Sequence, residues 1–301
     1  SEANSIKIGM KLGDNLESGR YTNKLVFSIL TNDYNQIAMM TEGPDFNTKL
    51  KSLEPPTSEI NYFRKSPVPP ATSMNAVNIE DEESDYEIKL WLDPTDKTAY
   101  YYTETEKVYL NSDSSKMFYS DLYEQKIRNV LEMDLSNFDT SKVTNMSSMF
   151  LGMVNLTTLN LSNFNTSQVT NMGGMFGFMS NLTSLNLISF DTSQVTNMAA
   201  MFFNIVLLTT LDLSNFNTSQ VTNMNGMFSL PDMWASNDKL EKIYVNNDFN
   251  TSKLTTFSNI FSNRKKLRGG NGSYLTDPST ADKSWLRVDR PGVHGYFTKK
   301  S

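Results

Sequence analysis

The chain has 301 residues with 27 Lys and Arg against 33 Asp and Glu, a formal net charge of −6, so a nucleic-acid-binding protein is not expected. It has no cysteine and a single histidine, His294, which excludes thiol nucleophiles, disulfides and metal sites that require two imidazoles. A Ser-His-Asp triad would have to use that histidine, and we expect neither a cofactor nor a metal. No apolar stretch approaches the ~18 residues that a membrane helix needs, so no membrane insertion is expected.

Residues 1–43 are predicted to form a β-hairpin segment. The stretches IKIGMKL and YTNKLVFSIL read as two strands around a turn from Gly13 to Gly19. The string SGRYTNKLVFSILTN resembles the last strands of Ig-like sandwich modules in Gram-positive surface proteins. A lone hairpin is only marginally stable in water, so the segment either packs on the rest of the chain or is the end of a truncated sandwich. Since the chain opens with Ser-Glu-Ala and no leader pattern, we expect a processed protein or a fragment.

Two stretches come before the repeats. Residues 44–87 are rich in proline, with Pro55-Pro56 and Pro67-Val-Pro-Pro, and are predicted to run extended as a stiff linker or a strap. Residues 88–118 are predicted to form an N-terminal cap and the first coil. Within them, Leu-Trp-Leu at 90–92 and Tyr-Tyr-Tyr at 100–102 would form a hairpin that covers one end of the repeats.

Residues 119–268 repeat with a period of 26. Four Met-Phe pairs show the spacing, namely Met149-Phe150, Met175-Phe176, Met201-Phe202 and Met227-Phe228. A weaker unit follows from Leu240 and an incomplete one ends at Phe118, which makes about six coils.

Each repeat combines two hydrophobic periods. Leu159 and Leu161 alternate with polar residues, as in a short strand with one buried face. The next apolar residues are spaced i, i+3, i+6 and i+7, which predicts a short helix from Val169 to Phe176. Thr and Ser oxygens just before it would cap the start of that helix. Stacked copies would bury all of these apolar residues as continuous ladders.

One strand and one helical turn per repeat predict an α/β fold, a right-handed leucine-rich-repeat solenoid of about six coils. A parallel β-sheet would form one side and short helices the other, with a β-rich N-terminal cap and an N-terminal β segment. A three-sheeted parallel β-helix is the rival fold, but its coils would lack the helical stripe. Residues 269–301 are predicted to form the C-terminal cap, with Trp285, Val288, Tyr296 and Phe297 covering the last coil.

The repeat motif is long enough to compare with a family. The unit reads LSNFDTS from Leu135 and VTNM from Val143, and the pattern returns three more times. It resembles the BspA-type leucine-rich repeats of bacterial surface proteins, over roughly residues 88–300. Units of that family often carry a Cys after the Met-Phe pair, where Gly177, Phe203 and Ser229 stand here. The resemblance implies extracellular display on a bacterial cell surface and adhesion to host or microbial ligands, with no catalytic residues.

The exposed side of the strands is the usual binding surface of such solenoids. We take as candidate ligand-binding residues on it Asn160, Asn186, Asp212, Lys242 and Tyr244. Their side chains could hydrogen-bond a glycan or an extended peptide, or they could simply solvate an exposed parallel strand.

An insertion interrupts the period near the C-terminal end. Phe216 and Phe249 are 33 residues apart instead of 26, and the added segment 229–239 carries Trp234. An exposed aromatic residue on such a loop is a candidate binding residue. Alternatively, the indole folds back over the coil beneath it.

Charge is distributed unevenly along the chain. Residues 80–106 hold ten acids and two bases, whereas residues 264–300 hold nine bases and three acids. A basic run could bind an anionic polymer, or its cations could complement the negative end of the helix in the last coil. The run consists of Arg264, Lys265, Lys266 and Arg268.

These features predict a non-enzymatic, monomeric cell-surface adhesin or binding module that recognises a host or microbial protein or glycan. The alternative is a structural spacer or self-assembly module of the bacterial surface. An enzyme with paired carboxylates is disfavoured because the acids on the repeat face are isolated. We expect the binding site at the C-terminal coils, where the distinctive side chains gather, rather than as equal weak contacts from every coil.

Overall fold

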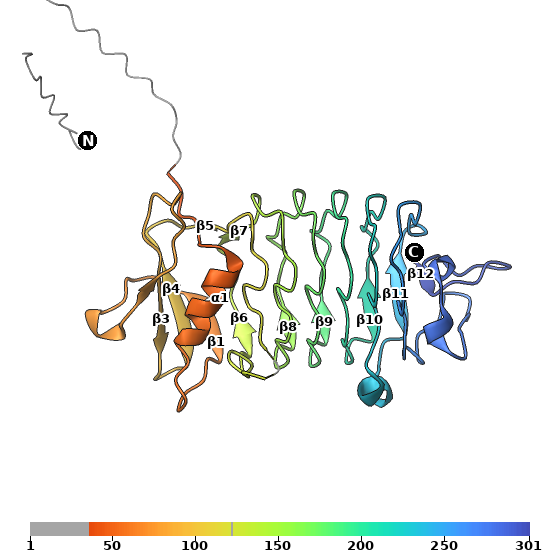
Figure 1. Ribbon diagram of the computed structural model, residues 1–301, viewed down its shortest axis with the longest axis horizontal. Coiled ribbons are helices and arrows are strands. Elements are labelled where there is room, and N and C mark those ends of the chain that lie inside the picture. Colours follow the sequence, from red (N-terminus) through yellow and green to blue (C-terminus); the bar gives the residue numbers. More distant parts are fainter. Residues whose placement is uncertain (1–35, 122) are drawn as a thin grey trace, which may run out of the picture. The chain divides into compact units, whose positions relative to one another are not determined.

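The computed structural model describes residues 36–121 and 123–301, so the strands predicted over 6–31 lie outside the described residues. Residues 36–301 form one compact unit. It is a mixed α/β fold with several small sheets and few helices (Figure 1). Its helical elements are α1 (Gly43–Ser52), η1 (Thr72–Met74), η2 (Asp232–Asn237), η3 (Pro278–Thr280) and η4 (Lys283–Trp285). Its strands are β1 (Tyr62–Lys65), β2 (Val77–Asn78), β3 (Lys89–Asp93), β4 (Thr98–Tyr102), β5 (Val108–Tyr109), β6 (Glu132–Met133), β7 (Phe138–Asp139), β8 (Thr158–Leu159), β9 (Ser184–Leu185), β10 (Thr210–Asp212), β11 (Lys242–Val245) and β12 (Phe297–Lys299).

The N-terminal part of this unit is a five-stranded sheet in the order β2-β3-β4-β1-β6. The antiparallel pair β3–β4 is the hairpin predicted from the Leu-Trp-Leu and Tyr-Tyr-Tyr stretches. Strand β1 lies parallel to both β4 and β6 and so connects this hairpin to the first repeat.

The segment 44–87 differs from the extended linker that its prolines predict. It contains α1 and β1, and it buries Phe46, Leu50, Ile60 and Phe63 in the main core. Pro44 stands in the first turn of α1, where proline needs no N–H partner and its fixed φ suits a helix. The apolar side chains therefore fold the segment onto the repeats, and its prolines stand at the start of α1 and in the connecting segments after α1 and β1.

The repeats pack with equivalent residues side by side. Thr158 of β8 pairs with Ser184 of β9, and Thr210 of β10 pairs with Lys242 of β11, all in parallel register. A second row of parallel bridges joins asparagines one repeat apart, namely Asn145, Asn171, Asn197 and Asn223. Figure 1 shows the successive repeats as neighbouring loops of chain, with β6, β8, β9, β10 and β11 along one side.

Phenylalanine rings from the Met-Phe pairs form a continuous stack through the core. Phe176 lies between Phe150 and Phe202, with ring centroids 6.1 and 5.8 Å apart and ring planes within 12° of parallel. The stack extends to Phe118 at one end and to Phe261 at the other. The predicted burial of Met172, Met175, Phe176, Leu159 and Leu161 is confirmed, since none is more than 5% exposed.

The Met-Phe segments form turns, and the predicted short helices are wrong. Met149 N–H donates to Met146 O (3.2 Å) with Ser148 at φ +56°, the geometry of a type II turn. The next N–H, that of Phe150, donates to Met175 O of the following repeat at 3.0 Å. Consecutive four-residue turns give apolar residues the spacing of a helix, but alternate N–H groups bond between repeats instead of to residue i−4.

Buried threonines also join the repeats, and they do not cap helices as predicted. The Thr166 hydroxyl donates to Asp191 O (2.8 Å) and accepts from Asp191 N–H (2.9 Å). The same two bonds join Thr140 to Asn165 and Thr192 to Asn217. Each threonine hydroxyl therefore serves as the hydrogen-bond partner of two backbone groups in the next repeat. It does so at a corner of the repeat, where the parallel ladder of backbone hydrogen bonds is interrupted.

The C-terminal cap closes the last repeat. Strand β12 pairs in parallel with β11, and Tyr296 packs on Phe261 and on Trp285, each at a centroid distance of 4.7 Å. None of the helices within residues 36–121 and 123–301 has the length and hydrophobicity of a membrane span.

Candidate binding surface

Two rows of partly exposed side chains run across the strands at the C-terminal end. Thr210 of β10 lies opposite Lys242 of β11 in the first row. In the second, Asp212 lies opposite Tyr244, which in turn lies opposite Thr298 of β12. The sequence therefore placed Asp212, Lys242 and Tyr244 correctly on one strand face, and the structure brings them into contact distance of the cap.

An ion pair crosses this face. Lys300 Nζ lies 2.6 Å from Asp212 Oδ2 and donates to Ser214 Oγ at 3.2 Å. Partial burial opposes ionisation of Asp212, but the hydrogen bonds from Lys300 and Ser214 outweigh it and lower the pKa of the carboxyl. Lys300 comes from the cap, which sequence reasoning had not connected to this site. No local pattern could reveal a partner 88 residues away.

Lys242 and Tyr244 keep part of their surface free. Lys242 Nζ donates one hydrogen bond to Gly269 O at 3.0 Å, which leaves two of its three N–H groups unused by that bond. Tyr244 is half-buried, and it lies between Asp212 of β10 and Thr298 of β12. The pair offers a cation and an aromatic face at alternate positions of β11, on the same side of the strand.

The insertion 229–239 forms η2, which projects from the edge of the repeats just before β11 (Figure 1). Met233 is 79% exposed, whereas Trp234 is half-buried. The indole therefore lies between the two alternatives left open by the sequence: it is neither fully exposed nor folded away.

Arg264 is a buried residue, and its prediction as a surface ligand is wrong. Its guanidinium is 1% exposed, lies 2.7 Å from Asp238 Oδ1 and donates to Ile205 O at 2.8 Å. Burial lowers the pKa of Arg264, and the Asp238 carboxylate opposes that effect. The pair fixes the end of the insertion to the last repeat. Sequence reasoning missed Asp238, which no pattern distinguishes from other loop acids.

The other three residues of the basic run differ in their surroundings. Lys265 and Lys266 are exposed. Arg268 stacks over Tyr274 at 4.1 Å from the ring centroid and donates to Lys265 O at 2.7 Å. Because turns precede the run in place of a helix, the proposed complement to a helix dipole is also wrong.

Asn160 and Asn186 are exposed but locally engaged. Each Oδ1 accepts from the backbone N–H two residues on, Ser162 and Ile188 respectively, at 3.1 Å. These Asx turns shape the end of each strand and leave the amide nitrogens facing solvent. The two residues are four repeats and three repeats removed from the C-terminal cap and do not join the site.

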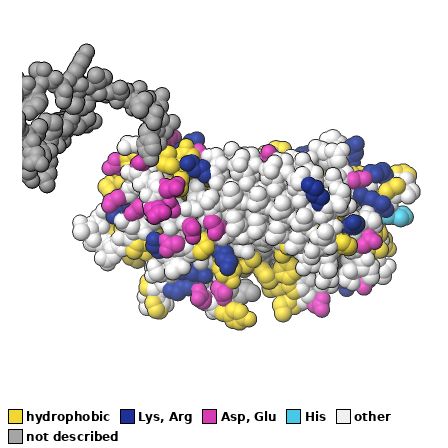
Figure 2. Space-filling model, turned by 45° about the horizontal axis from the view of Figure 1, so that its top comes forward, with side chains coloured by type: hydrophobic (Ala, Val, Ile, Leu, Met, Phe, Trp, Pro, Cys, Tyr) yellow, Lys and Arg dark blue, Asp and Glu magenta, His cyan; other side chains and the backbone are white. Residues whose placement is uncertain are grey.

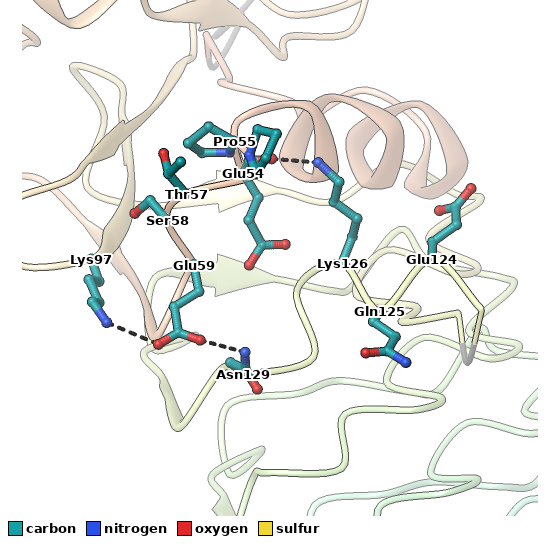
Figure 3. Close-up of a pocket in the computed structure, with 11 residues that line it drawn as sticks. Glu54, Pro55, Thr57, Ser58, Glu59, Lys97, Glu124, Gln125, Lys126 and Asn129 are labelled. Carbon is teal, nitrogen blue, oxygen red and sulfur yellow. Dashed lines mark hydrogen bonds and ion pairs between the residues drawn. The ribbon is translucent and has the colours of Figure 1, made fainter.

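A cavity of about 580 Å³ lies elsewhere, beside the C-terminal end of α1 (Figure 3). Its acidic lining is already paired: Glu59 bonds to Lys97 (2.9 Å) and Asn129, and both Glu54 oxygens accept backbone N–H groups. Across the part of the chain that the structure describes, no three His, Asp or Glu side chains are grouped so as to hold a metal ion.

The parallel stacking of repeats and the small sheets define a repeat-containing, β-rich protein. A family model described as "Mycoplasma protein of unknown function, DUF285" matches residues 112–242 and 178–285, which together cover more than half of the chain. The chain belongs to this family. No curated protein and no solved structure matches it.

Proposed function

We propose that this chain is a non-enzymatic binding module of a cell surface, built as a solenoid of about six BspA-type leucine-rich repeats. Its strand face would contact a host or microbial protein or glycan, outside the cell. The family match and the 26-residue stacking support the repeat class. The turn geometry departs from the helical side of the expected solenoid, and we retain only its stacked strand face.

The observation that carries the proposal is the change of the strand face at its C-terminal end. The two middle strands, β8 and β9, present only short polar side chains in these two rows, among them Asn160 and Asn186. The last strands add Lys242 and Tyr244 beside the Asp212–Lys300 pair, next to an insertion with Trp234. An aromatic anchor beside cations provides contact area and steers an acidic or hydroxyl-rich partner.

The test compares two double variants on the same probes, a mammalian glycan array and a panel of immobilised extracellular-matrix proteins. Trp234→Ala with Tyr244→Ala should lose most of the binding to any probe that wild-type binds, because both aromatic contacts are removed. Asn160→Ala with Asn186→Ala is the matched control and should bind almost as wild-type does. Equal losses in the two variants would contradict a localised site.

The location is tested separately. In cells that produce the natural protein, externally added protease should remove it, whereas a cytosolic marker stays intact. If no probe binds and the chain self-associates in a concentration-dependent manner, the spacer or self-assembly function replaces the proposed one.

A further inference from the structure

A second surface lies at the edge of the molecule where each repeat turns after its Met-Phe pair. Two insertions fall at this same point of the repeat: Phe118 and Phe150 are 32 residues apart, and Phe228 and Phe261 are 33 apart, instead of 26. The loops they form carry the exposed side chains Tyr123 (94%) and Met233 (79%). Between them lie the three repeats without an insertion.

Three partly exposed apolar side chains occupy the edge of those repeats. Phe178 and Phe203 lie with ring centroids 5.1 Å apart and planes tilted by 60°. Leu151 packs over Gly177, where an added Cβ would lie 3.5 Å from Leu151 Cδ1. We call Leu151, Phe178 and Phe203 the edge row. Figure 2 shows hydrophobic side chains gathered along the lower edge of the molecule.

Phe178 stands in a conformation that does not suit it. It is the third residue of a type II turn, with φ +58°, and the equivalent positions of other repeats hold Gly152, Asn204 and Asn263. Glycine and asparagine tolerate this left-handed region, whereas a bulky aromatic residue there is strained. The glycine or asparagine that neighbouring repeats carry at this position would suit the turn better. Strain of this kind points to a use for the partly exposed ring itself.

The charge around the edge row indicates what the ring contacts. From residue 143 to residue 231 the chain contains two charged side chains, Asp191 and Asp212, and no Lys or Arg. In Figure 2 the charged side chains gather over the two ends, and the middle is mostly uncharged. A charged ligand would lose hydration there without gaining a counter-charge. An uncharged ligand with hydroxyl groups could use the accessible Ser180 and Asn181 side chains that follow Phe178 in the sequence.

We propose that the edge row binds an uncharged oligosaccharide, with the Phe178 and Phe203 rings against the apolar faces of its sugar units. Aromatic rings supply the contact area, and the short polar side chains beside them supply hydrogen bonds, directly or through water. This surface differs from the strand face with Tyr244 and does not depend on it.

The experiment titrates the purified full chain with four neutral hexasaccharides, namely chitohexaose, cellohexaose, maltohexaose and mannohexaose, and with polygalacturonate as the anionic probe. At least one neutral probe should bind wild-type with a Kd in the millimolar range or tighter. Phe178→Asn, which installs the residue of a neighbouring repeat, should weaken that binding roughly tenfold or more. Its melting temperature should equal or exceed that of wild-type, because the strain is relieved.

Two control variants make the result specific. Ile188 lies in the repeat that carries Phe203 and is 64% exposed, and the equivalent residue of other repeats, such as Ser162, is serine. Ile188→Ser should therefore leave binding unchanged. Tyr244→Ala should also leave it unchanged, which separates this surface from the strand face. The proposal is overturned if no neutral probe binds, or if polygalacturonate binds more tightly than every neutral probe. It is also overturned if Phe178→Asn binds as wild-type does. A melting temperature of Phe178→Asn well below that of wild-type would overturn it as well, because the ring would then have a packing role.

Discussion

The stacked Phe176 ring shows what one residue contributes to the repeats. It is completely buried between Phe150 and Phe202, so its removal leaves a cavity that neighbours on both sides have to fill. Phe176→Ala should lower the free energy of unfolding by about 3–5 kcal/mol in urea titrations, from lost transfer energy plus the cavity. The exposed Ile188→Ser variant should change it by less than about 0.5 kcal/mol. A loss below about 1 kcal/mol for Phe176→Ala would contradict the packed stack.

The buried Thr192 hydroxyl tests the bond between repeats. It donates to Asn217 O (2.9 Å) and accepts from Asn217 N–H (2.8 Å), so its loss leaves two backbone groups without partners. Thr192→Val keeps the shape and should cost about 1–3 kcal/mol of unfolding free energy, whereas Thr192→Ser keeps the hydroxyl and should cost less. If the valine and serine variants are equally stable, the hydroxyl does not hold the corner.

At the scale of elements, the insertion is attached to the last repeat through a buried charge pair. Arg264 also donates to the backbone oxygen of Ile205, so one side chain ties η2 to two repeats. Arg264→Met leaves the Asp238 carboxylate buried without its cation and should cost about 3–5 kcal/mol in urea unfolding.

Two further variants interpret that loss. Lys265→Met removes the neighbouring exposed cation and should be nearly neutral. Adding Asp238→Asn to Arg264→Met removes the unpaired charge and should restore part of the stability. If Arg264→Met behaves like Lys265→Met, the pair does not fix the insertion.

At the scale of the whole molecule, the cap and the last repeat are joined by the pair Asp248–Arg290, with Oδ2 and Nη2 2.8 Å apart. The hydrogen bond from Arg290 lowers the pKa of Asp248 from its ordinary value of 3.8. Because the pKa of Asp248 is lower in the folded protein, the unfolded chain takes up the proton first as the pH falls. The contribution of the pair to the free energy of unfolding is therefore complete above about pH 4 and declines as the pH falls through the lowered pKa.

Asp248→Asn should therefore reduce the fall in unfolding free energy between about pH 4 and pH 2. Because both side chains are substantially exposed, the difference should stay below about 1 kcal/mol and shrink at high salt. An Asp248→Asn profile that runs parallel to wild-type through this range would show that the pair contributes nothing to the attachment of the cap.

Much of this protein could be predicted from the sequence because its core is periodic. The 26-residue spacing alone identified Leu159, Met172 and Phe176 as buried, since every copy needs the same side to stack on its neighbours. It also placed Asp212 and Tyr244 on one strand face, because parallel register aligns residues one repeat apart.

Only the tertiary structure decided the local conformation of the Met-Phe segments and the partners of the charged side chains and of β1. Spacing of i, i+3, i+6 and i+7 fits a helix and a run of tight turns equally well. The choice depended on whether N–H groups such as that of Phe150 find acceptors in the next repeat. The burial of Arg264 depended on a loop carrying Asp238, and the place of β1 depended on pairing with β4 and β6 far along the chain. Contacts between distant segments leave no periodic pattern, and the sequence by itself therefore determined the core but not the turns or the charged pairs that surround it.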